Sequence, residues 1–394
     1  MHFDSLSARE WKDPRTTQPH ILPIYATSSF DFEDIEHSMR VFANIEEGHT
    51  YSRYRNPTVD ATAAKIAAME TFETGIEAGA IMTNSGMAAI DLLIGGLLQA
   101  GDKILTQATL YGGTTELLMK VVAKTGIEII IGDLTNGKEI ESILEKDPSI
   151  RLVYFETPAN PTLACVDIEM ITEITSRNQR WSAIDNTFAS PYLQRPFKFG
   201  VDFVLHSTTK YLNGHGNGMA GIVIGKDVQL MNEKIWTQMK LTGVNCSPFE
   251  AWLVYQGLKT LPLRMHKHCS NALFLAYKLA EHPKVAFVNY PGLESHPDYM
   301  IARKQMDQSG GMLSFELKGN LEDAIRTMNN FKLCSLAPTL GDVDTLILHP
   351  ASSSHIKVSP EIRKKAGISD SLIRVSVGIE NPQDILEDFL QAIG

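Results

Sequence analysis

Residues 203–210 have the sequence Phe203-Val204-Leu205-His206-Ser207-Thr208-Thr209-Lys210, in which an apolar run ends in three hydroxyl residues and a lysine. The apolar part predicts a short buried strand, and the polar part follows at its carboxyl end. More apolar runs of this kind lie between residues 78 and 224, and segments of helical length separate several of them. Strand and helix in alternation favour an α/β fold with a mostly parallel central sheet covered on both faces.

The predicted strands of this sheet are short apolar runs bounded by polar or turn residues. They are Ala78–Thr83, Lys103–Thr106, Glu128–Ile131, Leu152–Glu156, Ser182–Asp185, Phe203–His206 and Gly221–Ile224. Helices are expected at Met87–Leu98, Thr114–Thr125 and Ile168–Asn178. Polar side chains at the carboxyl ends of such strands are the usual place for a ligand.

Two other parts of the chain differ from this pattern. Residues 1–55 are polar, and three prolines there discourage long helices, so we expect an irregular arm that rests on another surface: Pro14, Pro19 and Pro23. After residue 247, an amphipathic run from Phe249 to about Glu281 leads into strands at Ala286–Tyr290, Met312–Leu317 and Leu372–Val377 and a last helix at Pro382–Ala392. The expected parts are therefore the arm (1–55), an α/β domain (56–247) and a smaller α+β C-terminal domain (248–394).

Charge and composition indicate a protein that acts on small molecules. The formal net charge is −10 and the basic residues are scattered, so no nucleic-acid partner is expected. The first residues show no secretory signal, and the most apolar stretch, Ala88–Leu98, is too short to span a bilayer, so no membrane association is expected. The four cysteines lie far apart, which is typical of reduced thiols and favours a cytoplasmic protein without a metal site.

Lys210 and Asp185 lie at the ends of two predicted strands, and together they favour a cofactor with an aldehyde. A partly desolvated lysine has an amine that is accessible near neutral pH and can form a Schiff base. A carboxylate that faces a pyridine nitrogen keeps it protonated, so that the ring accepts electrons. Each residue also has a plainer alternative, since Lys210 can be a surface lysine and Asp185 can cap a helix or form a turn.

Further positions fit the same ligand. Gly86 allows a tight turn before a helix, where the amides of Gly86 and Met87 can face a phosphate. Ser207 and Thr209 offer hydroxyl donors to the same group. Tyr111 follows another strand and can stack on a pyridine ring or exchange a proton. The alternatives are an ordinary turn at Gly86 and a half-buried core tyrosine at Tyr111.

Six motifs, in the right order, resemble the cystathionine γ-synthase-like enzymes of cysteine and methionine metabolism, near methionine γ-lyase, cystathionine γ-lyase and cystathionine γ-synthase. The likeness extends from about Pro23 to the C-terminus. The motifs lie at 51–58, 85–87, 156–161, 185–187, 207–216 and 372–378. The resemblance implies the pyridoxal phosphate-dependent transferase fold of type I, as in aspartate aminotransferase, and pyridoxal 5′-phosphate as the cofactor.

The resemblance also implies roles for single residues. Lys210 would form the Schiff base and move protons, and Tyr111 would be the second catalytic residue. The cofactor would be bound by Gly86, Met87, Tyr111, Asn160, Asp185, Thr187, Ser207, Thr209 and Lys210. Tyr51 and Arg53 would reach the phosphate of the neighbouring subunit, so that a dimer is the smallest active unit and a homotetramer of two dimers is expected.

Arg374 would bind the α-carboxylate of an amino-acid substrate with its planar guanidinium, and Ser335 would assist through its backbone. Asp344 would meet a distal amino group of the substrate, or it is a solvated loop residue. The implied reaction is γ-elimination, which gives a 2-oxo acid and ammonia, or γ-replacement by a thiol. Methionine, cystathionine and O-acylhomoserine are the candidate substrates.

Some positions depart from the relatives and leave the γ-substituent open. Residues 340–352 are most similar to methionine γ-lyases, but those enzymes have a cysteine where this chain has Gly113, and Lys-Asp where it has Lys240-Leu241. Asn217 replaces the aspartate that usually follows Gly-His-Gly. The alternatives are an O-acylhomoserine sulfhydrylase, a lyase for a non-sulfur γ-substituted amino acid, an aminotransferase, and a non-catalytic protein that binds pyridoxal phosphate.

Overall fold

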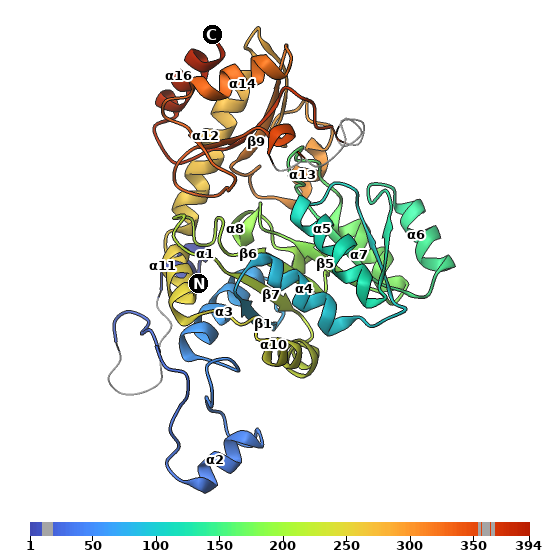
Figure 1. The fold of residues 1–394 in the computed structure, drawn as a ribbon, viewed down its shortest axis with the longest axis vertical. Coiled ribbons are helices and arrows are strands. Elements are labelled where there is room, and N and C mark those ends of the chain that lie inside the picture. The colour runs from blue at the N-terminus through green and yellow to red at the C-terminus, as the bar shows by residue number, and fades with distance from the viewer. Residues whose placement is uncertain (10–18, 354–355, 357–362, 364–366) are drawn as a thin grey trace.

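The computed structural model describes residues 1–9, 19–353, 356, 363 and 367–394 (Figure 1). Pro14, one of the prolines of the predicted arm, lies outside these residues. The described part contains two sheets, one of seven strands and one of five. The seven-stranded sheet is built from the first two thirds of the chain, and the smaller sheet from the last third.

The central sheet has the strand order β1-β7-β6-β5-β4-β2-β3. Only β7 runs antiparallel to its neighbours, which confirms the predicted mostly parallel sheet. The strands are β1 (Gly79–Thr83), β2 (Lys103–Thr106), β3 (Glu128–Ile131), β4 (Ile150–Glu156), β5 (Trp181–Asp185), β6 (Phe203–Ser207) and β7 (Gly221–Gly225). Each predicted strand is present, with its ends within two residues of the prediction.

Alternate side chains of the strands enter two separate cores, one on each face of the sheet, because successive strand residues point to opposite sides. In β4, Val153 and Phe155 belong to one core, and Leu152 and Tyr154 belong to the other. The first core is covered by α3 (Pro57–Glu70), α7 (Ile168–Arg177) and α11 (Pro248–Leu258), and the second by α4 (Gly86–Leu97), α5 (Gly112–Lys120) and α10 (Trp236–Thr242). The sheet is therefore buried on both faces, as its apolar strands require.

The second sheet has the order β10-β11-β12-β9-β8. Its strands are β8 (Val285–Asn289), β9 (Met312–Leu317), β10 (Ser335–Leu336), β11 (Leu346–Leu348) and β12 (Leu372–Ser376). The short strands β10 and β11 were not predicted. Helices α14 (Leu321–Asn330) and α16 (Pro382–Ile393) pack on each other beside this sheet.

The amphipathic run predicted over 249–281 is two helices rather than one. Helix α11 ends at Leu258, and α12 extends over Leu261–Ala280 with Pro262 in its first turn. Proline is tolerated there because the first amides of a helix have no partner within it. In Figure 1, α12 rises from the central sheet to the second sheet and joins the two halves of the molecule.

The described residues of the N-terminal arm contain two short helices and no long one, so the arm is not irregular throughout, although the prolines were expected only to discourage long helices. Helix α1 (Phe3–Ala8) packs against the body, where the ring of Phe3 lies 5.5 Å from that of Phe72. Helix α2 (Ile35–Phe42) is capped by Asp34, whose side chain accepts a hydrogen bond from the backbone of His37. Figure 1 shows α2 projecting well away from both sheets.

The remaining helices are mostly short. They are η1 (Val122–Thr125), α6 (Gly137–Lys146), α8 (Ser190–Leu193), η2 (Pro196–Phe199), α9 (Val228–Leu230), the π-helix η3 (Met231–Ile235), α13 (Tyr299–Gln305) and η4 (Pro350–Ser352). No helix among the described residues is long and apolar enough to cross a membrane.

Two helical glycines give a test of how tightly their helices pack against neighbouring segments. A Cβ on Gly257 would lie 2.1 Å from the backbone oxygen of Asn213, whereas a Cβ on Gly95 would meet only the flexible end of Gln238, at 3.0 Å. Gly257→Ala should lower the free energy of unfolding by about 2 kcal/mol through overpacking. Gly95→Ala should be neutral or stabilising by up to about 1 kcal/mol through helix propensity. Urea denaturation measures both, and equal effects would contradict this packing.

Candidate active site

Lys210 lies just after β6, in a loop that faces the second sheet. Its Nζ donates a hydrogen bond of 2.8 Å to Oγ1 of Thr339, and its backbone N–H donates to the carbonyl of Ser207. Burial and the nearby Arg374 cation lower the pKa of Lys210 to about 8, while the Asp342 carboxylate opposes this shift. The amine is therefore neutral in a large fraction of molecules near pH 8, as a nucleophile or a base requires.

Arg374 is a buried cation that acts on this lysine. It lies in the middle of the second sheet, in β12, and its side chain is only about 5% exposed. Nη2 donates to the carbonyl of Thr339 at 2.8 Å, and Nη1 donates to Oδ1 of Asn160 at 3.4 Å. Burial lowers the pKa of Arg374 to about 10, and its Nε has no hydrogen-bond partner among the described residues. A buried guanidinium without a carboxylate partner is suited to an anionic ligand.

Asp185 ends β5, and the register places it beside Glu156 at the end of β4. Oδ1 of Asp185 accepts the backbone N–H of Thr187 at 3.0 Å. Burial raises the pKa of the Asp185 carboxyl, and the Thr187 hydrogen bonds and the His206 charge oppose the rise. A buried acceptor of this kind is suited to a positively charged ring nitrogen, which would restore its ionised form.

Glu156 fixes the backbone of Tyr111, since both carboxylate oxygens accept the Tyr111 N–H, at 3.0 and 2.9 Å. Burial and the nearby Asp185 charge raise the pKa of Glu156 well above its usual range. The side chain of Tyr111 is about half exposed and lies beside Gly113, where a Cβ would be 2.5 Å from the Tyr111 ring and 3.2 Å from the sulfur of Met87. The absence of a side chain at Gly113 therefore leaves room for the ring in this position.

The turn at Gly86 meets the end of β6. Helix α4 begins at Gly86, and a Cβ there would lie 2.7 Å from Cβ of Ser207. A Cβ on Gly221 of β7 would lie 2.2 Å from the carbonyl oxygen of Ser85. These approaches bring the amide end of α4 to the hydroxyl of Ser207, whose own backbone N–H donates to Oγ1 of Thr187 at 2.8 Å. Free amides at a helix start beside hydroxyls can bind a phosphate.

Thr209 faces the neighbouring strand, and its Oγ1 exchanges hydrogen bonds with the backbone of Ala220 at 3.1 and 3.2 Å. Asn217, in the same loop, accepts a hydrogen bond from Asn213.

Ser335 and Asp344 are not brought to Arg374 by any contact described here. The backbone N–H of Ser335 donates to the carbonyl of Thr345, as β10 pairs with β11. Asp344 is exposed to solvent. Thr339 contacts both Lys210 and Arg374 instead. The sequence analysis did not select Thr339, and its only sequence signal is its position directly before the 340–352 stretch that is similar to methionine γ-lyases.

Tyr51 and Arg53 lie on the arm, away from Lys210. Arg53 donates to the carbonyl of Lys240 in α10 and stacks over Tyr54 at 4.9 Å from the ring centre, while Tyr51 is 41% exposed. Leu241, next to Lys240, is also exposed, at 72%.

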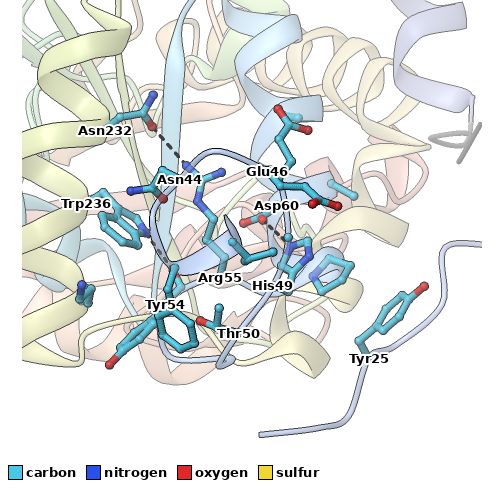
Figure 2. A pocket seen from close by; sticks show the side chains of 18 of the residues that line it. Tyr25, Asn44, Glu46, His49, Thr50, Tyr54, Arg55, Asp60, Asn232 and Trp236 are labelled. Atoms are coloured by element: carbon cyan, nitrogen blue, oxygen red, sulfur yellow. Dashed lines mark hydrogen bonds and ion pairs between the residues drawn. The ribbon is translucent and has the colours of Figure 1, made fainter. Parts of the chain in front are cut away.

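A hollow of about 1880 Å³ lies between the arm and α10 (Figure 2). Figure 2 shows Arg55 reaching Asn232, at 3.2 Å, and His49 beside Asp60, at 3.0 Å. Trp236 donates from its indole to the carbonyl of Tyr54. The residues around Lys210 do not line this hollow.

The chain matches the family model of the Cys/Met metabolism PLP-dependent enzymes over residues 5–394. The chain belongs to this family. It is 46% identical to an L-methionine gamma-lyase of Fusobacterium nucleatum over 374 residues, which cover 94% of this chain and 93% of the relative. It is 38% identical to an O-succinylhomoserine sulfhydrylase of Pseudomonas aeruginosa over 391 residues, which cover 99% and 95%.

The chain is also similar to a solved structure of cystathionine gamma synthase from Xanthomonas oryzae pv. oryzae in complex with aminoacrylate and cysteine. The TM-score is 0.92 and the sequence identity is 34%, and the match covers 100% of this chain and 98% of the solved one. The fold is therefore that of the pyridoxal phosphate-dependent cystathionine enzymes, as predicted. The chain is a pyridoxal phosphate-dependent enzyme of this Cys/Met metabolism family.

The residues present fit pyridoxal phosphate. An amine with a lowered pKa, a buried carboxylate and a helix start at Gly86 match its aldehyde, its ring nitrogen and its phosphate in turn. Throughout the residues that the structure describes, no group of three or more His, Cys, Asp or Glu side chains could hold a metal ion. His349, for example, uses both ring nitrogens in contacts with Ser352 and the carbonyl of Asp370.

The lowered pKa of Lys210 predicts the pH dependence of cofactor uptake by the protein stripped of pyridoxal phosphate. Covalent uptake requires the neutral amine, so its rate should rise with pH, with a midpoint at about 8. Arg374→Gln should raise that midpoint because the guanidinium lowers the pKa. Stopped-flow absorbance measures the rate. Lys65→Met is the control, since Lys65 also has a pKa of about 8, and a changed midpoint in that variant would contradict the assignment.

Proposed function

We propose that this enzyme eliminates or replaces the γ-substituent of a sulfur amino acid, with Lys210 as the base and Arg374 as the site of the α-carboxylate. The observation that carries the proposal is the shared contact on Thr339: its hydroxyl accepts from Lys210 at 2.8 Å, and its carbonyl accepts from Arg374 at 2.8 Å. A carboxylate bound by Arg374 then brings the adjacent α-carbon to the amine of Lys210. Chemistry at the γ-carbon is what the family and the named relatives support.

The cofactor residues are assigned in the same proposal. Asp185 holds a proton on the ring nitrogen, and Asn160 and Thr187 complete the ring site. The phosphate is assigned to Gly86, Met87, Ser207 and Thr209. Pyridoxal phosphate, when bound, supplies a ring that accepts electrons from the substrate's α-carbon.

Lys210 moves the protons of the reaction. It removes the proton from Cα and a second one from Cβ, and its pKa of about 8 lets one nitrogen both accept and return a proton. Tyr111 donates a proton to the leaving group at Cγ, with its backbone fixed by Glu156. In the proposed site Thr339 takes the place beside Arg374 that was expected for Ser335.

Elimination with release of a thiol is proposed as the main reaction, since the methionine γ-lyase relative is 46% identical. Replacement on an O-acylhomoserine is the second candidate, favoured by the sulfhydrylase relative and by Gly113, which leaves the ring of Tyr111 unobstructed. Asp344 remains a candidate for the distal amino group of cystathionine.

The arm is assigned to assembly. Exposed apolar side chains gather on and after α2: Ile35, Met39, Phe42 and Ile45. We propose that a second chain covers them and fills the hollow beside α10, so that Tyr51 and Arg53 reach the partner's phosphate site, in a homotetramer. We also propose the domain limits 1–55, 56–247 and 248–394, and a cytoplasmic location, to which the four buried free cysteines are suited.

A substrate panel separates the two reactions. The enzyme is incubated with methionine, cystathionine, O-acetylhomoserine or O-succinylhomoserine, each with and without cysteine or sulfide. Elimination gives 2-oxobutanoate and ammonia without a thiol, whereas replacement gives a thioether or a thiol-containing amino acid only when the thiol is added. Turnover of none of these substrates by the loaded enzyme would refute the proposal.

Arg374→Lys tests the carboxylate assignment. The compact ammonium group of lysine cannot bind a carboxylate with two parallel hydrogen bonds as the planar guanidinium can. The value of kcat/KM should therefore fall about 100-fold, mainly through a higher KM. The dissociation constant of pyridoxal phosphate should change by less than about threefold, since Arg374 makes no assigned contact with the cofactor. Equal loss of cofactor binding and substrate use would contradict the assignment.

A further inference from the structure

The segment 339–342 lies along the loop between β6 and β7, residues 208–220, which contains Lys210 and is named the lysine loop. The segment approaches this loop at three points. Thr339 accepts the hydrogen bond from Lys210 Nζ. A Cβ on Gly341 would lie 2.7 Å from the backbone nitrogen of Tyr211 and 3.0 Å from the carbonyl carbon of Lys210. A Cβ on Gly216 would lie 2.2 Å from Oδ2 of Asp342. These two segments come from opposite halves of the molecule, and they pack so closely at Gly216 and Gly341 that a Cβ at either glycine would clash.

Asp342 and Asp344 are two carboxylates on this segment with different surroundings. Oδ1 of Asp342 accepts the backbone N–H of Val343 at 3.1 Å, and Oδ2 rests against Gly216. Asp342 is half-buried, whereas Asp344 is exposed. The carboxylate of Asp342 is therefore fixed in place on the lysine loop, and Asp344 is not.

The charges around Lys210 give Asp342 a role. Arg374, from β12, and Asp342 act on Lys210 with opposite signs. Arg264, from α12, donates to the carbonyls of Tyr211 and Gly257, at 2.8 Å each, and has no carboxylate within ion-pair distance among the described residues. Asp342 is the carboxylate that acts on Arg264 as well. Of the charged groups that act on Lys210, Asp342 is the acidic one and Arg374 is the basic one.

We propose that Asp342 is a positioning residue for Lys210, a fixed counter-charge that clasps the lysine loop to the segment of Thr339 and stabilises the protonated form of the amine. The inference rests on the proposed function, in which Lys210 is the base. Through Thr339, the same clasp keeps the lysine in register with Arg374, so that the base and the carboxylate site move as one unit. A half-buried charge is effective here because solvent screens it less than a surface charge.

The test is the pH profile of kcat for the holoenzyme with its best substrate from the panel. The base must be neutral to accept a proton, so the acidic limb marks its titration. Removing the negative charge in Asp342→Asn should move this limb to lower pH by about one unit. At pH values below the limb, activity relative to the plateau then rises up to about tenfold. Asp342→Glu should keep the limb within a few tenths of a unit of wild type.

Glu294→Gln is the control, because it removes an equal negative charge from an exposed residue that has no part in the proposed site. Its acidic limb should stay in place. An unmoved limb in Asp342→Asn, or equal shifts in both variants, would overturn the proposal. A loss of stability in Asp342→Asn with no shift of the limb would also overturn it, since that outcome shows only a packing role.

Failure of the underlying function has a different signature. Lys210→Arg keeps a cation but cannot serve as the base near neutral pH, so turnover should be lost while the fold remains. If Lys210→Arg still turns over substrate, the proposed function is wrong, and the result with Asp342 then concerns another base.

Discussion

The burial of the Arg374 guanidinium beside the amine of Lys210 is the constraint on which the rest of the site depends. Two cationic groups share one residue, Thr339, and Arg374 forms no ion pair among the residues described. Burying a guanidinium without a carboxylate is costly, and the fold offsets only part of this with neutral oxygens from Thr339 and Asn160. In the proposed function, the α-carboxylate of the substrate completes the site. The mutual repulsion also lowers the pKa of Lys210, which makes the lysine useful as a base.

The central sheet provides the other half of the site through its register. Parallel strands end at one edge, so Glu156 and Asp185 lie side by side, and β6 delivers Ser207 and Lys210 next to them. Burial raises the pKa of both carboxyl groups, and the Asp185 charge raises that of Glu156 further. In the proposed function, a positively charged ring nitrogen at Asp185 favours its ionised form. Close approaches at Gly86 and Gly341 then bring α4 and the 339–342 segment onto the same strand end. The site is thus assembled from both halves of the chain.

The sequence predicted the sheet well because buried parallel strands are apolar runs with polar ends. Strands β2, β3 and β9 have the limits that were predicted. The break between α11 and α12 was missed because the amphipathic pattern continues through Lys259 and Thr260, so periodicity gives no sign of it. Helix α2 was missed because the polar composition and prolines of the arm outweighed its Asp34 cap.

The residues of the site divide in the same way. Lys210, Asp185 and Gly86 could be found from strand ends, and Arg374 from the family motif. Ser335 and Thr339 are both hydroxyl residues on one stretch, and no pattern distinguishes them until tertiary contacts place Thr339 on Lys210. The same holds for Asp342 and Asp344, whose difference is burial against a glycine of a distant loop.

The most direct test of the account is the identity of the lysine that holds the cofactor. The loaded enzyme is reduced with borohydride, digested, and analysed by mass spectrometry for the phosphopyridoxyl group. Lys65 is the competing residue, since it also has a pKa of about 8 and donates to the carbonyl of Arg9 in a buried position. The account predicts one modified peptide, containing Lys210. Modification of Lys65 or of any other lysine, with the Lys210 peptide unmodified, would contradict it.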